Sequence, residues 1–241
     1  MESNQYKSEI EINGFTIINS IYTEEEVSRL LYVIENTESS GDTFRKSADL
    51  FAIRQFLKEA PATLPVILNN NLRQIITSIF GNDYFIVKSI YFDKPEVSNW
   101  FVAYHQDLTI SVDRKTEIDH FGPWTVKQNQ FAVQPPLHVL ENIYTIRIHL
   151  DETNQDNGAL KVVPQSHSKH IYRPENINWE TETETTCNVE KGGIMIMKPL
   201  LLHSSGRTIN NKRRRVIHIE FSSALLPQPL QWAEKTDINL N

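Results

Sequence analysis

The sequence predicts an α+β fold that is mainly β, with N-terminal helices packed on one sheet. Apolar residues recur at helical spacing in the first third of the chain. From Tyr84 onward, β-branched and aromatic segments separated by turn residues are typical of β-strands. Helices followed by strands favour a fold in which helices cover one face of a β structure, although the order of the strands stays open. With 241 residues, 39% of them hydrophobic, we expect a single domain over residues 1–241.

The predicted N-terminal elements are one strand and two amphipathic helices. Residues Gly14 to Ile18 form a short apolar strand. Thr23 and Glu26 then make a capping box, in which each side chain bonds the other residue's backbone N–H at the start of a helix. A second helix is predicted over Leu72 to Phe80, with Gly81 as its C-terminal stop. The stripes that would pack against a sheet are Val27, Leu30, Leu31 and Ile34 in the first helix, and Leu72, Ile75, Ile76 and Ile79 in the second.

Two predicted strands, residues 143–150 and 213–221, each have one apolar and one polar face, because alternate side chains of a strand point to opposite sides. The apolar faces hold Ile146, Ile148 and Leu150 in the first strand and Ile217, Ile219 and Phe221 in the second. The other faces hold Thr145, Arg147 and His149 in the first strand and Arg214, Val216, His218 and Glu220 in the second. These polar faces can line a pocket, or they can belong to an ordinary half-exposed sheet, and the pattern leaves both interpretations open.

Composition argues against several classes of partner. A net charge of −6 disfavours binding to a nucleic-acid backbone, and the only basic run, Lys212 to Arg215, is short. The single cysteine, Cys187, cannot form an intramolecular disulfide and fits a reducing compartment. The N-terminus has no apolar leader, and the apolar stretch Ile194 to Leu202 is too short to span a bilayer. We therefore expect a soluble, cytoplasmic protein with a small-molecule partner and with no nucleic-acid or membrane partner. Its oligomeric state is left open.

The segment His105-Gln106-Asp107 carries the most specific chemistry. If it is a strand, His105 and Asp107 project from one face and can reach the same point, whereas Gln106 points away. A second imidazole would complete the two-His-one-carboxylate triad that holds non-haem Fe(II) and leaves open positions for substrate and O₂. His203, which follows a long apolar run, is the candidate for that imidazole. An isolated H-x-D occurs by chance in many chains, so the surrounding sequence has to carry the assignment.

Seven segments supply that context, in this order: KSIYFDKPEVSNW, YHQDLT, FGPW, VQPP, RIHLDE-x4-NGALKVVPQSH, GGIMIMKPLLLHSSGR and RRRVIHIEF. In these segments the chain resembles the phytanoyl-CoA dioxygenase family of Fe(II)/2-oxoglutarate oxygenases, and closely resembles its bacterial members, from Gly14 to Trp232. The resemblance implies a double-stranded β-helix, or jelly roll, of the cupin type, with the metal near its open end. It also implies Fe(II) as the metal and 2-oxoglutarate and O₂ as cosubstrates, with His105, Asp107 and His203 as metal ligands and catalytic residues.

The carboxylate of 2-oxoglutarate that is remote from the metal suits a guanidinium, which can bind it through two parallel hydrogen bonds. Arg214 has the strand parity of the polar face, whereas Arg213 and Arg215 have the parity of the apolar face. Arg214 also stands eleven residues after His203, which matches the family's placement of its oxoglutarate arginine. Ser205 matches the family's hydroxyl partner of the same carboxylate, and the alternative is a surface serine.

Other candidate residues are less sharply defined. Lys88 matches a family position that contacts cosubstrate or substrate, or it is an edge-strand lysine facing solvent. Gln106 is assigned a supporting hydrogen bond at the cofactor site. The long connection from Thr109 to Pro136, which contains Trp124, is expected to be a lid or binding loop, or else a cover for the barrel edge. Arg147 can receive a substrate carboxylate or pair with the glutamate of the neighbouring polar face. The predicted substrate pocket comprises Trp124, Thr145, Arg147, His149 and His218.

Within this resemblance, Asp107 favours hydroxylation, because related halogenases have a small residue at the carboxylate position so that chloride can bind iron there. The expected activity is hydroxylation of a small organic substrate at an unactivated carbon, with release of succinate and CO₂. The alternative is a non-catalytic relative that binds a metabolite or a metal as a sensor. The complete set of His105, Asp107, His203 and Arg214 favours the enzyme.

Overall fold

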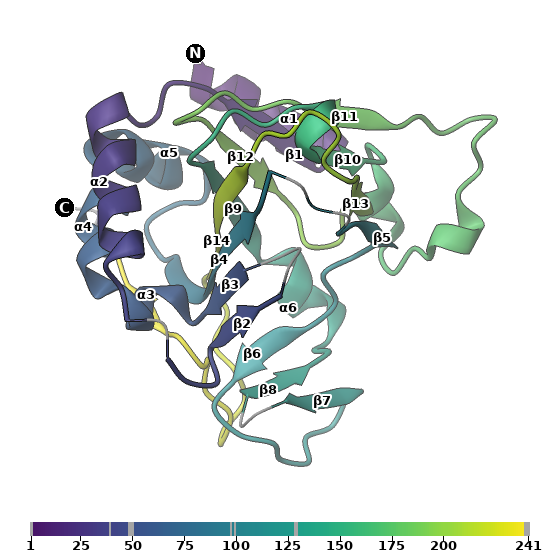
Figure 1. Ribbon diagram of the computed structural model, residues 1–241. Helices are drawn as coiled ribbons and strands as arrows, with labels where there is room; N and C mark the ends of the chain where they lie inside the picture. Colours follow the sequence, from purple (N-terminus) through teal and green to yellow (C-terminus); the bar gives the residue numbers. More distant parts are fainter. Residues whose placement is uncertain are drawn as a thin grey trace.

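A larger and a smaller antiparallel β-sheet pack against each other in a jelly roll (Figure 1). The structure, a computed structural model, describes residues 2–38, 40–47, 51–96, 98, 100–127 and 130–238. The larger sheet has the order β1 (Phe15–Ile18), β12 (Ile194–Met197), β9 (Tyr144–His149), β14 (Arg214–Ser222), β4 (Phe85–Lys94), β3 (Phe51–Arg54) and β2 (Phe44–Lys46), and β15 (Thr236–Asp237) pairs with β4. The smaller sheet has the order β11 (Thr185–Cys187), β10 (Leu160–Val162), β13 (His203–Ser205) and β5 (Val102–His105). The predicted fold class is therefore confirmed.

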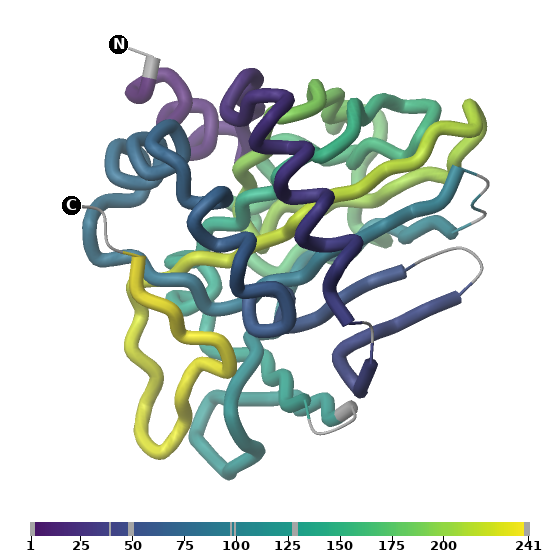
Figure 2. Tube along the Cα trace, turned by 60° about the vertical axis from the view of Figure 1, so that its left-hand side comes forward, coloured from purple at the N-terminus to yellow at the C-terminus, as the bar shows by residue number. Residues whose placement is uncertain are grey.

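The N-terminal helices precede most of the strands, as predicted, and lie on the larger sheet (Figures 1 and 2). These N-terminal helices are α1 (Glu2–Asn13), α2 (Glu24–Glu35), α3 (Phe56–Glu59), α4 (Leu64–Ile67) and α5 (Asn70–Ile79). One further helix, α6 (Leu137–Glu141), comes later in the chain. Short 3₁₀ turns lie at Pro61–Thr63, Gln155–Asn157, Ser166–Lys169 and Pro174–Asn176. The capping box of Thr23 and Glu26 starts α2 as predicted. The helix α5 begins two residues earlier than predicted, because the Asn69 side chain accepts the Leu72 N–H at 2.9 Å. In the described part of the chain, no helix is long and apolar enough to cross a membrane.

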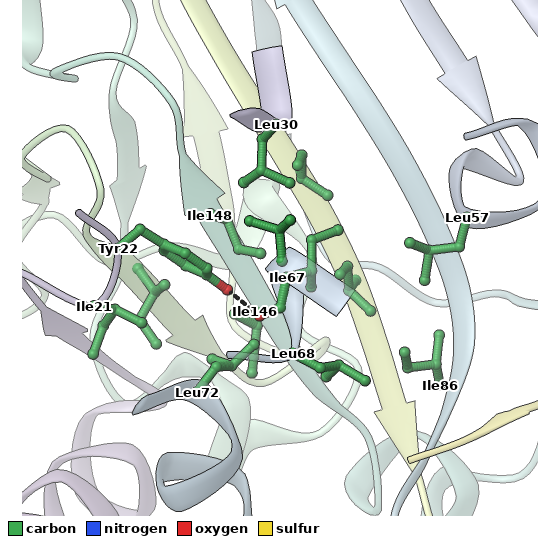
Figure 3. Close-up of a cluster of buried hydrophobic side chains, with 14 of the residues drawn as sticks. Ile21, Tyr22, Leu30, Leu57, Ile67, Leu68, Leu72, Ile86, Ile146 and Ile148 are labelled. Carbon is green, nitrogen blue, oxygen red and sulfur yellow. Dashed lines mark hydrogen bonds between the residues drawn. The ribbon is translucent and has the colours of Figure 1, made fainter. Parts of the chain in front are cut away.

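The main hydrophobic core lies between the helices and the larger sheet (Figure 3). There Ile146 and Ile148 of β9 lie near Leu30 of α2, and the Tyr22 hydroxyl donates a hydrogen bond of 2.7 Å to the Ile67 carbonyl. The predicted apolar faces of β9 and β14 both belong to this core, through Ile146, Ile148 and Leu150 and through Ile217, Ile219 and Phe221. The opposite faces of these two strands therefore point toward the smaller sheet.

The space between the two sheets is apolar in one part and polar in another. The apolar part is filled by Leu160, Val162, Cys187, Val189, Met195, Met197 and Leu201. The polar part contains the buried side chains of His203, Arg214 and His218. Buried polar groups need partners, so the polar part is where a ligand site is expected.

Residues 109–136, predicted as one long connection, contain a three-stranded sheet. The strands β6 (Ile110–Val112), β8 (Gln130–Val133) and β7 (Trp124–Lys127) pair in the order β6-β8-β7, at the bottom of Figure 1. Ile110 and Val133 are buried in a second hydrophobic cluster that also contains Trp232. Residues 128 and 129, within this predicted connection, lie outside the described residues. The segment is therefore a folded insert with a core of its own, and its role as a lid, a binding loop or a cover for the barrel edge stays a prediction.

Candidate metal centre and cosubstrate cavity

His105 and His203 lie side by side in the smaller sheet, where β5 pairs with β13. Their ring centroids are 4.3 Å apart. The strand β5 ends at His105, so the three residues of the motif do not form one strand. Asp107 lies beyond this end, and its N–H donates to the Pro199 carbonyl at 2.9 Å. The Asp107 carboxylate lies 3.9 Å from Nε2 of His105 and 3.8 Å from Nε2 of His203. Since two ligand bonds of roughly 2.0 to 2.2 Å together span about 4 Å, one ion can contact all three side chains.

Both imidazoles are held in the tautomer that leaves Nε2 available to a metal. Nδ1 of His105 lies 2.9 Å from the carbonyl oxygen of Ala103, and Nδ1 of His203 lies 2.8 Å from that of Leu201. A carbonyl oxygen only accepts, so Nδ1 carries the proton and Nε2 presents its lone pair. A hydrogen bond of this kind also fixes the ring orientation of a metal-binding histidine.

The charges around Asp107 fit a divalent cation. Its carboxylate has no side-chain hydrogen bond to any residue that the structure describes. Burial opposes its ionisation, but the protonated form that His203 adopts in acid and the Lys88 ammonium hold the pKa of Asp107 well below its usual range. Burial lowers the pKa of His203 to about 4, so this imidazole is neutral at pH 7. An unsatisfied carboxylate beside two imidazoles is the donor set of a non-haem Fe(II) site.

The three side chains line a cavity of about 230 Å³ between the two sheets. The other lining residues are Lys88, Ile90, Phe92, Trp100, Val102, Arg147, Leu160, Ser204, Ser205, Arg214 and His218. Arg214 is buried, and its Nη1 donates to the Gly158 carbonyl, while its Nε has no partner among the described groups. Arg147 is also buried with an unpartnered Nε. Burial lowers the pKa of Arg214 to about 9 and that of Arg147 to about 10. Two guanidiniums in one cavity can bind the two carboxylates of a dianion such as 2-oxoglutarate.

The two arginines that flank Arg214 point away from this cavity. Arg213 forms two hydrogen bonds with Asp93, of 2.8 and 2.5 Å. Arg215 forms two with the Asp151 carboxylate, of 2.9 and 2.8 Å. Of the three, Arg214 is the one that lines the cavity, as the alternation of side chains along the final strand requires.

A buried hydrogen-bonded chain forms one wall of the cavity. Nζ of Lys88 lies 2.7 Å from Oε1 of Glu220, which lies 3.2 Å from Nε2 of His218. Nδ1 of His218 in turn lies 3.2 Å from Nη1 of Arg147, so Arg147 contacts this histidine rather than the glutamate. Asp107, His218 and Glu220 are also close enough to hold a metal. Lys88 already neutralises Glu220, however, so the first triad is the better metal site.

Gln106 does not line the cavity, and its supporting role at the cofactor site stays a prediction. Its side-chain amide donates to the carbonyls of His170 and Leu200, at 2.8 and 2.5 Å. Its carbonyl oxygen accepts the Tyr172 N–H at 2.8 Å. Gln106 therefore ties the backbone next to Asp107 to two other loops.

Three of the predicted substrate-pocket residues do not line the cavity either. Trp124 packs against the second hydrophobic cluster from β7. Thr145 and His149 are buried on the inner face of β9, and Nδ1 of His149 lies 2.7 Å from Oγ1 of Thr153. Arg147 and His218 are the predicted pocket residues that line the cavity.

Sequence reasoning missed the apolar lining of the cavity. Ile90 and Phe92 follow Lys88 at two-residue spacing along β4, so strand alternation could have identified both. Trp100 lies in the connection before β5, where the sequence has no periodic pattern.

Comparison with known proteins gives relatives that are distant in sequence. A protein of Stutzerimonas stutzeri named "Probable alpha-ketoglutarate-dependent hypophosphite dioxygenase" is 27% identical over 103 residues, which is 36% of this chain and 36% of that protein. The match thus spans about a third of this relative.

Solved structures share the fold. EctD from S. alaskensis with bound Fe aligns with a TM-score of 0.69 at 13% identity, over 90% of this chain and 75% of that chain. AviO1 from Streptomyces viridochromogenes Tue57 aligns with a TM-score of 0.64 at 17% identity, over 93% of this chain and 96% of that chain. Residues 10–216 match the family model described as "Phytanoyl-CoA dioxygenase (PhyH)". Because that match covers most of the chain, the protein belongs to the phytanoyl-CoA dioxygenase family.

Proposed function

We propose that this protein is an Fe(II)- and 2-oxoglutarate-dependent hydroxylase, built as a single domain of residues 1–241, that oxidises a small organic substrate at an unactivated carbon. The observation that carries the proposal is the convergence of His105, Asp107 and His203 in the cavity that also contains the Arg214 guanidinium. A metal triad alone fits many activities. A triad beside a buried anion-binding group fits a metal that shares its cavity with a dianionic cosubstrate.

The proposed role of each residue follows from the donor and acceptor atoms that it presents to the cavity. His105 and His203 would bind Fe(II) through Nε2, and Asp107 through its carboxylate. Arg214 and Ser205 would bind the remote carboxylate of 2-oxoglutarate, the arginine with its planar fork. When bound, iron and 2-oxoglutarate supply the oxidation of a C–H bond by O₂, with release of succinate and CO₂. The apolar side chains of the cavity would keep bulk water away from the reacting atoms.

The type of reaction rests on Asp107. A carboxylate in this position supports hydroxylation over halogenation, for which chloride would need the same position on iron. Relatives in fold include an epimerase, SnoN, and a carbocyclase, SnoK, so the fold alone does not select the reaction. The name of the Stutzerimonas stutzeri relative supports the cosubstrate, but its match is too short to carry over its substrate.

The test begins without oxygen. Purified protein mixed with Fe(II) and 2-oxoglutarate is expected to develop the weak visible absorption of the metal chelate, and His203→Ala is expected to lose it. Absence of the absorption in the wild-type protein would overturn the proposal. Under air, a panel of small organic compounds is then screened for succinate release above the substrate-free rate. A chelate without any turnover on such a panel would favour the non-catalytic sensor instead.

A further inference from the structure

A second cavity lies beside the cavity lined by His105, Asp107 and His203 (hereafter the iron cavity), and the two have lining residues in common. Its volume is about 410 Å³, which is ample for a small organic molecule. Lys88 and Ile90 of β4 line both cavities. Thr109 also lines the second cavity and follows the proposed iron ligand Asp107 by two residues. The two cavities are therefore direct neighbours, and a molecule in the second lies next to the metal centre.

The inserted sheet β6-β8-β7 closes one side of this second cavity. It contributes Ser111 and Val112 from β6, Thr125 from β7, and Gln130, Phe131 and Ala132 from β8. The opposite side comes from Arg54 at the end of β3, Lys58 of α3 and the C-terminal segment at Glu234. The insert is thus a wall of this cavity.

The uncompensated charge in the second cavity is positive. Arg54 faces it from β3, opposite Ile90 of β4 in the sheet register. Its guanidinium has no ion pair or hydrogen bond with any residue that the structure describes. Lys58 donates to the Ala233 carbonyl at 2.7 Å and has no carboxylate within ion-pair distance among those residues. Two cationic groups thus face the cavity without a direct counter-ion from the described chain.

The two carboxylates of the cavity wall are already satisfied. Asp113 lies 2.6 Å from Nε of Arg114 and accepts the Gln231 N–H at 2.9 Å. Glu234 accepts hydrogen bonds from the hydroxyl and the N–H of Ser89, at 2.5 and 3.2 Å. Burial also raises the pKa of Glu234 to about 7, which weakens its negative charge near neutral pH. A cationic ligand would therefore find little free negative charge here, whereas an anionic ligand would meet an unpaired guanidinium.

We propose that the second cavity binds the substrate and that the substrate is a small organic carboxylate whose carboxylate group is bound by Arg54, with Lys58 nearby. The inference rests on the proposed function, since it makes the iron cavity the place where this molecule is oxidised. Its carbon skeleton lies along Ile90 and Lys88, which line both cavities, and extends toward the metal. The protein then has two separate anion sites: Arg214 for the cosubstrate and Arg54 for the substrate.

The test is a paired screen. Short-chain carboxylic acids and their uncharged primary amides are compared for stimulation of succinate release by the wild-type holoenzyme. Acids are expected to stimulate release, and the matching amides are not. For a stimulating acid, Arg54→Ala should raise KM by about ten-fold or more while leaving kcat within about two-fold, because a charge-assisted contact remote from the reacting carbon is lost. Arg54→Lys should recover part of that loss.

Two controls separate this inference from simpler explanations. Arg45→Ala removes the same charge from the exposed face of the neighbouring strand β2, outside both cavities, and should leave the KM for the acid unchanged. Arg54→Ala should also leave the KM for the cosubstrate unchanged. Stimulation by amides as strong as by acids, no stimulation by any acid, or an unaltered KM in Arg54→Ala would each overturn the inference. If the anaerobic chelate still forms in those cases, the proposed function survives and the substrate assignment alone fails.

Discussion

Nε2 of His203 lies 3.8 Å from a carboxylate oxygen of Asp107, and the opposite nitrogen of the same ring bonds the Leu201 carbonyl at 2.8 Å. This hydrogen bond therefore orients the ring toward a shared metal. Asp107→Ala removes one of the three proposed ligands and should abolish both the anaerobic chelate absorption and 2-oxoglutarate turnover. His105→Ala should do the same.

The control for these variants is the exposed His138 of α6. His138→Ala should keep the chelate absorption and the turnover of the wild-type protein. The metal-free variants should also retain the wild-type circular dichroism spectrum, because the helices and the apolar strand faces form the main core without the metal. A chelate of undiminished intensity in Asp107→Ala would remove this carboxylate from the triad.

The second prediction separates Arg214 from its neighbours. Arg214→Lys keeps a positive charge but loses the planar fork, so the KM for 2-oxoglutarate should rise by about 10- to 150-fold, equivalent to roughly 1.5 to 3 kcal/mol for hydrogen bonds to a charged group. Arg213→Lys and Arg215→Lys disturb ion pairs with Asp93, Asp151 and Glu35, none of which lines the cavity, so they should leave this KM nearly unchanged. Steady-state kinetics at saturating substrate measure all three. A larger effect in either neighbour would contradict the cavity assignment.

Strand alternation is strong enough to orient the side chains of the final strand from the sequence alone. Ile217 and Ile219 fall in the main core and Arg214 and His218 in the iron cavity, as the two-residue period of this strand requires. One face of the strand is buried against helices, so a register slip by one residue would turn His218 and Glu220 toward the hydrophobic core and Ile217 and Ile219 away from it. The free-energy cost of burying these polar side chains makes the two-residue alternation a reliable predictor for this strand.

Short segments without a period are where sequence reasoning fails. The strand β5 ends at His105, and Asp107 approaches the two histidines of the triad from a loop. A hydrogen bond from the Asp107 N–H to the Pro199 carbonyl holds this loop in place. The pairing of β6, β7 and β8 depends on contacts with residues as distant as Trp232, which a local pattern does not contain. The hydrogen bonds of Gln106 could not be predicted for the same reason, because its partners His170 and Leu200 come from loops far along the chain.

The third prediction concerns the inserted sheet. Trp124→Ala should lower the free energy of unfolding by about 1 to 3 kcal/mol, less than for a fully buried aromatic residue, because Trp124 is only partly buried against its cluster. It should leave the substrate-free rate of succinate release unchanged, since Trp124 does not line the iron cavity. Val126→Ala, at an exposed position of the same strand, should cost little stability. Urea denaturation measures the free energy of unfolding, and the succinate assay measures the substrate-free rate. A raised substrate-free rate in Trp124→Ala would instead support a lid role for this residue.

The last prediction uses the buried carboxyl of Glu234. Burial raises its pKa from 4.5 to about 7, whereas hydrogen bonds from Ser89 and the charge of Lys58 act in the opposite direction. A carboxyl with a raised pKa binds its proton more tightly in the folded state, so its contribution to stability is lost as the pH rises from about 4.5 through about 7. The loss amounts to roughly 3 kcal/mol at pH 8, at about 1.4 kcal/mol for each pKa unit.

Glu234→Gln replaces this carboxyl with an amide that cannot ionise. The amide oxygen can still accept the Ser89 N–H, and the amide NH₂ can donate to the Ser89 hydroxyl oxygen. The stability of the variant relative to the wild-type protein should therefore increase between pH 5 and pH 8, and subtracting the two curves removes the contributions of all other titrating groups. Glu175→Gln, on the exposed surface, should give a flat difference. Urea denaturation at several pH values measures the effect, and a difference for Glu234→Gln that is constant with pH would show that this carboxyl does not titrate above its unfolded range.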